Sequence, residues 1–156
     1  MYSKTEFDLM ERAAMPFAIY QMIDMRVVPV VLSQGFLDVF GYEDRDEAYL
    51  LMENDMYRYT HHDDVARISE AALRFSKGES GYNVVYRTKA GDGYKIIHAY
   101  GQHVYPEEDV QLAIIWYVEK GAYVGNDMVH DDSLTKNYSI SLYELTLERK
   151  HNFDYL

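Results

Sequence analysis

Two short runs place histidine beside carboxylates, a combination that can bind a metal or move a proton. His61-His62-Asp63-Asp64 is the first run, and His130-Asp131-Asp132 is the second. A metal such as zinc needs three or four ligands that converge on one point. Adjacent side chains at a helix start diverge, and no further ligand set is placed to join either run. The same residues suit a helix N-terminus, where polar and acidic side chains satisfy free amides. We therefore interpret both runs as helix starts and predict no metal site.

Other catalytic chemistries lack the residues that they need. The chain has no cysteine, which removes disulfides, thiolate nucleophiles and Cys-ligated metals together. It has no Gly-rich phosphate loop, nucleophile elbow or metalloprotease motif. The net charge is −11, from 15 basic and 26 acidic residues, with no basic cluster that could follow a phosphate backbone. We predict a chain that is not an enzyme and does not bind nucleic acid.

Length and composition indicate one folded domain. The chain has 156 residues, of which 48% are hydrophobic, enough for a real core. It has neither a run of about eighteen apolar residues that could span a membrane nor a signal-peptide pattern at its start. We expect a soluble, cytoplasmic protein with no membrane partner.

The first half alternates helix and strand signals. Ser3-Lys4-Thr5-Glu6 has the form of a capping box, and the helix that it opens must end before Pro16. Strands are predicted over 17–22 and 26–33, around a tight turn. Because Pro29 cannot donate to a strand ladder, the second strand should be an edge or carry a bulge.

Short helices and a hairpin follow. One helix ends at Gly41, another covers 44–52, and a longer one begins with Thr60 as its cap and ends at Gly78. Strands 82–88 and 94–104 pair across a Gly-Asp-Gly turn, and 110–118 is apolar on both faces, which places it near the centre of a sheet. The predicted fold class is α+β: one antiparallel sheet with helices on one face.

The chain resembles a PAS sensory domain over residues 10–119, on three short matches in the family's order. These matches are Phe36-Leu37-Asp38-Val39-Phe40-Gly41-Tyr42, His61-His62-Asp63-Asp64, and the Tyr-Arg followed by a Lys-x-Gly-Asp-Gly hairpin over 86–93. Ser33 replaces the family's usual Asn, and His62 replaces its Pro. The resemblance implies a five-stranded antiparallel sheet that senses ligands or mediates dimerisation, with residues 1–15 as an N-terminal helix that packs on the sheet's outer face or on a partner. Residues 16–120 would be the sensory domain and 121–156 a mostly helical linker.

The resemblance also bears on cofactors. Haem-sensing relatives use a histidine in the long helix, and none lies between Val65 and Lys77. The light-sensing branch uses a cysteine for its flavin photochemistry, and this chain has none. We therefore expect no cofactor, with haem and flavin both disfavoured, and leave an unidentified small molecule as the alternative.

A pocket is predicted on the inner face of the hairpin. Ala99 and Gly101 are small, so they leave volume beneath the sheet, and Ile97 shares their face. Tyr86 and His103 would supply polar contacts and Trp116 a wall. The alternative is a core filled by side chains from the helices.

The linker suggests an output domain. In bacterial signalling proteins a helix often joins a PAS domain to a GGDEF (diguanylate cyclase) domain, which is commonly entered through Asp-x-Leu-Thr, and Asp154-Tyr155-Leu156 matches the first three positions. We therefore expect a sensory module that binds a small ligand or partner and regulates an attached cyclic-dinucleotide enzyme, as a homodimer. A ligand-free dimerisation module and a small acid/base enzyme are the alternatives.

Overall fold

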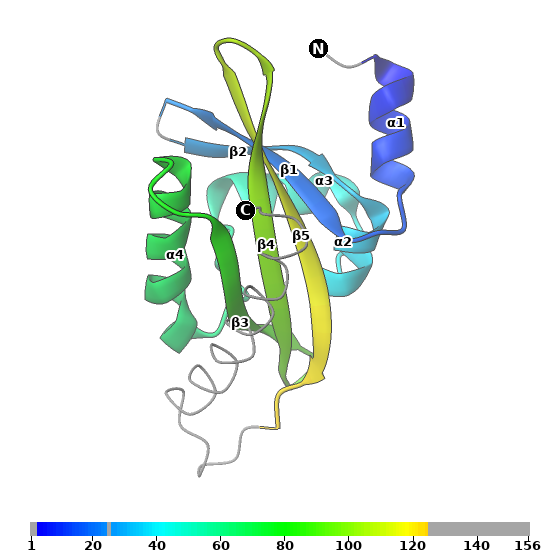
Figure 1. The fold of residues 1–156 in the computed structure, drawn as a ribbon. Coiled ribbons are helices and arrows are strands. Elements are labelled where there is room, and N and C mark those ends of the chain that lie inside the picture. The colour runs from blue at the N-terminus through cyan, green and yellow to red at the C-terminus, as the bar shows by residue number, and fades with distance from the viewer. Residues whose placement is uncertain (1–2, 25, 125–156) are drawn as a thin grey trace, which may run out of the picture.

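The computed structural model describes residues 3–24 and 26–124, which form one sheet and four helices (Figure 1). In chain order the elements are α1 (Lys4–Arg12), β1 (Phe17–Ile23), β2 (Arg26–Leu32), α2 (Gln34–Phe40), α3 (Arg45–Asn54), α4 (His62–Ser76), β3 (Tyr82–Ala90), β4 (Gly93–Glu107) and β5 (Val110–Ala122). The strands are antiparallel in the order β2-β1-β5-β4-β3. The predicted α+β fold with a five-stranded antiparallel sheet is confirmed.

The sheet follows from its turns and its apolar pattern. β3 and β4 pair from Tyr82 opposite Gly101 to Ala90 opposite Gly93, the hairpin that the Gly-Asp-Gly turn predicts. β5, apolar on both faces, lies at the centre. β2 is an edge strand, and its register against β1 shifts beside Pro29, so the strand has both features that proline favours there.

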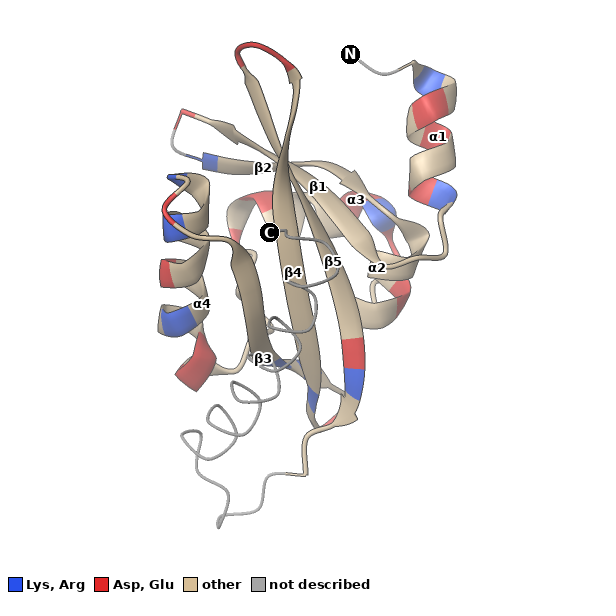
Figure 2. Ribbon diagram, in the orientation of Figure 1, with Lys and Arg blue, Asp and Glu red and all other residues tan. Residues whose placement is uncertain are grey.

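The helices divide between the two faces of the sheet. Helices α2, α3 and α4 cover one face, where their apolar side chains join the inner faces of β1, β3, β4 and β5 in the main core (Figure 1). On the other face, Phe7 and Met10 of α1 pack against a smaller cluster of Ile19, Val31 and Leu112. Charged residues lie mainly on the helices and at the β4–β5 turn, and few lie on the strands (Figure 2).

Local capping explains where the helices begin. Ser3 and Glu6 form the predicted capping box of α1. Ser33 caps α2 by accepting from the Phe36 amide, and α2 ends at Gly41 in the left-handed conformation. The prediction that Thr60 caps α4 is wrong: His61 is the N-cap, since its Nδ1 accepts from the Asp63 amide, while Thr60 forms a bridge with Thr88.

The described residues test the membrane prediction only within their own range, and several other predictions fall outside them. No helix in residues 3–24 and 26–124 is long and apolar enough to cross a membrane. The run His130-Asp131-Asp132, most of the linker 121–156 and the match at 154–156 lie outside the described residues.

Candidate functional site

A cavity of about 120 Å³ lies in the main core, between the inner face of the sheet and the helices that cover it. The helices supply mainly apolar side chains, including Met52 of α3 and Ile68, Ala72 and Phe75 of α4. The aromatic lining is unusually rich in tyrosine, from Tyr20, Tyr57, Tyr82, Tyr86 and Tyr117. No Asp, Glu, His, Lys or Arg of the described residues lines this space. It therefore suits an uncharged occupant, and it holds no group for acid/base catalysis at neutral pH.

Two of the tyrosines join neighbouring strands through their hydroxyls. The Tyr20 and Tyr117 oxygens are 2.9 Å apart, which links β1 to β5 across the cavity wall. Burial raises the pKa of both phenols above the ordinary value. Both groups stay protonated at neutral pH, so they act as hydrogen-bond donors and acceptors and not as charges.

Tyr86 presents an unused hydroxyl to the same space. Its side chain is 7% exposed, and burial raises its pKa well above the ordinary value. No hydrogen bond to its hydroxyl is found among the described residues, and no described side-chain nitrogen or oxygen that is sealed from solvent lacks a partner. The Tyr86 hydroxyl must therefore retain access to the cavity, where it can meet a ligand or a water molecule.

The predicted pocket residues of the hairpin share the inner face of the sheet, but not all of them line the cavity. Tyr86 lies in the cavity wall. Ile97 and Ala99 are fully buried in the same core, away from the open space. The volume expected below Gly101 is filled by Ile115, because a β-carbon built on Gly101 would lie 2.3 Å from Ile115 Cδ1. The free volume lies instead toward α3 and α4.

His103 holds the end of α4. Its Nε2 lies 2.7 Å from the Phe75 carbonyl, its ring stacks on the Phe75 ring at 4.0 Å, and Gln111 Nε2 lies 2.9 Å from Nδ1. These contacts fit an Nε2–H that donates to the carbonyl and an Nδ1 that accepts from Gln111. Both ring nitrogens are therefore engaged, and His103 does not line the cavity.

Trp116 lies on the opposite face of the sheet. Its neighbours Ile115 and Tyr117 face the cavity, so strand alternation turns Trp116 away. It stacks on Tyr100 of β4, with ring centroids 5.8 Å apart. The structure thus places Trp116 outside this cavity, because 115 and 117, not 116, have the inward phase on β5.

A smaller void lies beside the cavity. A void of about 40 Å³ shares Met52, Thr60 and Tyr86 with the cavity. On its other side, Tyr42 and Tyr59 line both this void and an open surface groove of about 380 Å³. Burial, with the nearby Tyr59, raises the pKa of Tyr42 to about 12. The Tyr42–Tyr59 pair thus separates the interior from the groove, with ring centroids 6.4 Å apart.

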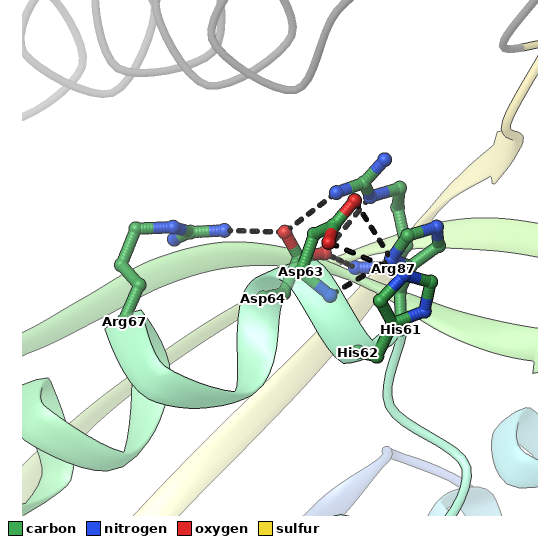
Figure 3. Close-up of polar contacts among 6 residues, drawn as sticks. All are labelled: His61, His62, Asp63, Asp64, Arg67 and Arg87. Atoms are coloured by element: carbon green, nitrogen blue, oxygen red, sulfur yellow. Dashed lines mark hydrogen bonds and ion pairs between the residues drawn. The ribbon is translucent and has the colours of Figure 1, made fainter.

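A buried ion pair fixes the other end of α4, as Figure 3 shows. Asp64 Oδ2 accepts from both the amide and Nε of Arg87 at 2.9 Å, and Oδ1 accepts from the second guanidinium nitrogen at 2.8 Å. Arg67 adds a contact at 3.2 Å. Burial alone would raise the pKa of Asp64, but the hydrogen bonds and charge of Arg87 outweigh it, and the pKa lies below its ordinary value. We call this group the Asp64–Arg87 clamp.

Backbone contacts extend the clamp along the edge of β3. The His61 amide donates to the Arg87 carbonyl at 2.9 Å, and the Lys89 amide donates to the Tyr59 carbonyl at 2.8 Å. The Arg87 guanidinium carbon also lies 5.0 Å from the ring centre of Tyr123. The sequence pattern indicated a helix start for Asp64 and only a family match for the Tyr-Arg pair that contains Arg87, so it did not predict the ion pair. An Asp at the start of a helix and an Arg in a strand give no joint signal until the two elements are placed together.

The histidine–carboxylate run converges more than expected. The atoms of His61, His62 and Asp63 that could bind a metal ion lie within 4.8 Å of one another, and the centroids of the two imidazole rings are 4.5 Å apart. His61 Nδ1, however, is used to cap α4 at 3.1 Å from the Asp63 amide. The geometry explains this run as a helix start.

Comparison with known proteins identifies relatives by structure alone. No protein-family model matches the sequence, and no curated protein matches it. The LOV protein of Rhodobacter sphaeroides is 17% identical, with a TM-score of 0.60 over 77% of this chain and 69% of that one. A variant of RsLOV is 16% identical, with a TM-score of 0.58 over 80% of this chain and 73% of that one. A light-oxygen-voltage domain studied with a flavin analogue is 17% identical, with a TM-score of 0.51 over 81% and 88%.

These comparisons correct the expectation on cofactors. Flavin was set aside because the chain has no cysteine, yet the structures that it matches are LOV domains, one of them studied with a flavin analogue. The expectation that the chain binds no flavin was wrong in its reasoning. A missing cysteine removes only the covalent bond that a flavin could form with the protein, whereas non-covalent binding needs a fitting cavity and hydrogen-bond partners. The cavity offers apolar walls and hydroxyls, but at about 120 Å³ it would have to widen to admit three fused rings. At such low identity the comparisons establish the fold: this chain has the PAS-type fold that LOV domains share.

Proposed function

We propose that this chain is a sensory module that binds a small molecule in the tyrosine-lined cavity. The observation that supports it most is an uncharged cavity of about 120 Å³ in the core, whose wall includes a Tyr86 hydroxyl with no partner among the described residues. A ligand-free dimerisation module would favour a filled core in the same place, because an empty cavity lowers stability.

In this proposal, β5 transmits the conformational change from the cavity to the C-terminal residues. Ile115 and Tyr117 of this strand line the cavity, and the strand continues to Ala122, from where the chain runs on into residues 125–156. A ligand changes the output only if it binds one arrangement of β5 and its neighbours more tightly than another. The Tyr20–Tyr117 hydrogen bond is the contact most open to such a bias, because a ligand oxygen competes for the same hydroxyls.

The proposed output is a diguanylate cyclase joined after Leu156. This part rests on the match of Asp154-Tyr155-Leu156 to the entry of such domains. Since the output enzyme works as a dimer in that family, we propose that the chain self-associates and that relative rotation of two linkers carries the signal. The module itself needs no catalytic residue for this role.

The proposal is tested on the full protein that contains this chain. The coding sequence after Leu156 should continue with Thr-Gly and, farther on, a Gly-Gly-Asp-Glu-Phe motif or a close variant. Cyclase activity of the whole protein should then respond to a substitution that fills the cavity, Ala72→Leu, and not to Ala66→Leu on the exposed side of α4. A different downstream domain would contradict the cyclase, and activity that is indifferent to Ala72→Leu would contradict the sensory role.

A flavin is the second candidate ligand, because the LOV structures favour it. It would require the tyrosines that line the cavity to move apart. Visible absorbance and flavin fluorescence of the purified chain distinguish it from a colourless ligand.

A further inference from the structure

We infer that the cavity takes an uncharged compound with a single ring and an oxygen that accepts hydrogen bonds. This inference rests on the proposed function, because it names the ligand class for the same cavity. Its grounds are the size of the space, the lack of charge around it and an excess of hydroxyl donors.

Size limits the ligand to about one ring. An apolar cavity of about 150 Å³ holds benzene, and the space here is about 120 Å³. Phe75 and Tyr82, whose ring centroids lie 5.5 Å apart, form an aromatic part of the wall. The space is thus somewhat smaller than one that holds benzene, so a planar ring with one small substituent enters it only with some outward movement of the walls.

The residues that line the cavity disfavour a charged ligand. None of the described side chains that face the cavity is an acid or a base. A carboxylate or phosphate would lose its hydration there and gain no opposite charge. The phenols cannot supply one, since burial keeps them protonated at neutral pH.

The hydroxyls leave donors unused. In the Tyr20–Tyr117 pair, one hydroxyl donates to the other oxygen, so the second proton is still available. Among the described residues no acceptor is found for that proton or for the Tyr86 proton. A ligand oxygen such as a carbonyl accepts two hydrogen bonds and would use both donors. Buried donors without a partner are unfavourable, so an acceptor gains more here than an apolar group of the same shape.

A quaternary ammonium is the competing class. Aromatic walls attract such cations, and the chain carries a net charge of −11. The unused hydroxyl protons of Tyr86 and of the Tyr20–Tyr117 pair favour a hydrogen-bond acceptor, because a quaternary ammonium cannot accept them.

The experiment titrates the chain with four probes and follows amide NMR peaks of cavity residues. Acetophenone carries the carbonyl, α-methylstyrene replaces that oxygen with CH₂, benzoate adds a charge, and choline tests the cation. We expect saturable shifts for acetophenone, with roughly tenfold tighter binding than α-methylstyrene, the size of one net hydrogen bond. Benzoate and choline should not saturate.

Tyr86→Phe should reduce the advantage of acetophenone over α-methylstyrene, because one of the two donors is lost, and leave α-methylstyrene binding unchanged. Tyr105→Phe is the matched control, because Tyr105 is 62% exposed and lies outside the cavity. Thermal melting of both variants confirms that they fold.

The outcomes separate the ligand class from the proposed function. Equal binding of acetophenone and α-methylstyrene, tighter binding of benzoate or choline, or a flavin released on denaturation would each overturn the ligand class while the cavity remains a ligand site. If no probe gives saturable shifts at the cavity and the purified chain carries no bound molecule, the ligand class and the proposed function fall together.

Discussion

The two parts of α4 are held in opposite ways. At its N-terminal end, each oxygen of Asp64 has two donors within 3.2 Å, from Arg87 and Arg67. One to three turns along, Ile68, Ala72 and Phe75 face a cavity in which the Tyr86 hydroxyl has no partner among the described residues. One region has its polar atoms paired, and the other leaves both volume and hydrogen-bonding capacity unused.

This contrast separates stability from sensing. A fully paired buried ion pair strongly penalises the loss of either member, so the clamp fixes where α4 meets the edge of β3. A cavity lowers stability, but it lets the tyrosines and α4 adjust to an occupant. Substitutions in the clamp should therefore change folding, whereas substitutions in the cavity should change binding.

The largest effect is expected from Asp64→Asn, which removes the carboxylate charge that pairs with the buried Arg87 guanidinium. The free energy of unfolding should fall by about 3–5 kcal/mol, which lowers the melting temperature by roughly 10 °C. Thermal and urea unfolding measure both. Glu70→Gln, an exposed acid on the same helix, should change little. Equal stability of the Asp64→Asn variant and the wild type would contradict the clamp.

Acid should remove the same interaction gradually. The folded pKa of Asp64 lies below its ordinary value, so its stabilisation is complete above the unfolded pKa of about 4 and is lost as pH falls through the folded pKa. The stability difference between wild type and Asp64→Asn should be constant near neutral pH and shrink below about pH 4. Urea unfolding at a series of pH values measures this difference, and a constant difference down to pH 2 would contradict the assignment.

An intermediate effect is expected from Gly101→Ala, which tests how full the core is beside the cavity. The new β-carbon would lie 2.3 Å from Ile115 Cδ1 and 2.8 Å from the Ile114 carbonyl oxygen. Such overpacking should cost about 1–3 kcal/mol. Gly93→Ala is the matched control, since nothing lies within 4 Å of its added carbon. Equal unfolding free energies for the two variants would mean that free volume extends below Gly101.

The smallest effect on stability, and the largest on binding, is expected from Ala72→Leu. The larger side chain points into a space of about 120 Å³, so stability should change by less than about 1.5 kcal/mol. Small-molecule binding at the cavity should be lost, because the leucine takes the ligand's place. Calorimetric titration with acetophenone compares this variant with Ala66→Leu, and unchanged binding would place the site elsewhere.

Much of the fold could be predicted because its signals are local. Ser3 and Glu6 gave the first helix, the Gly-Asp-Gly turn gave the register of β3 and β4, and a strand apolar on both faces gave the central position of β5. Thr60 failed as a cap because the next residue, His61, accepts from the helix amide instead.

The candidate site was harder to predict from the sequence, because it depends on the distances between the helices and the strands. The inward phase of Tyr86 could be predicted from the hairpin, whereas the volume expected under Gly101 is taken by Ile115, a residue from another strand. The cavity lies between β-strands and the side of α4, at a position that no sequence spacing defines. The Asp64–Arg87 pair spans 23 residues and two element types, so neither residue alone predicts it.

Native mass spectrometry of the purified 18.3 kDa chain tests the central claim most directly. If the cavity is a ligand site, the wild type should carry a small added mass that is lost on denaturation, or should gain one when acetophenone is supplied. The Ala72→Leu variant should show neither. A wild-type chain that stays at the polypeptide mass under both conditions, or an Ala72→Leu variant that retains the same added mass, would contradict the account.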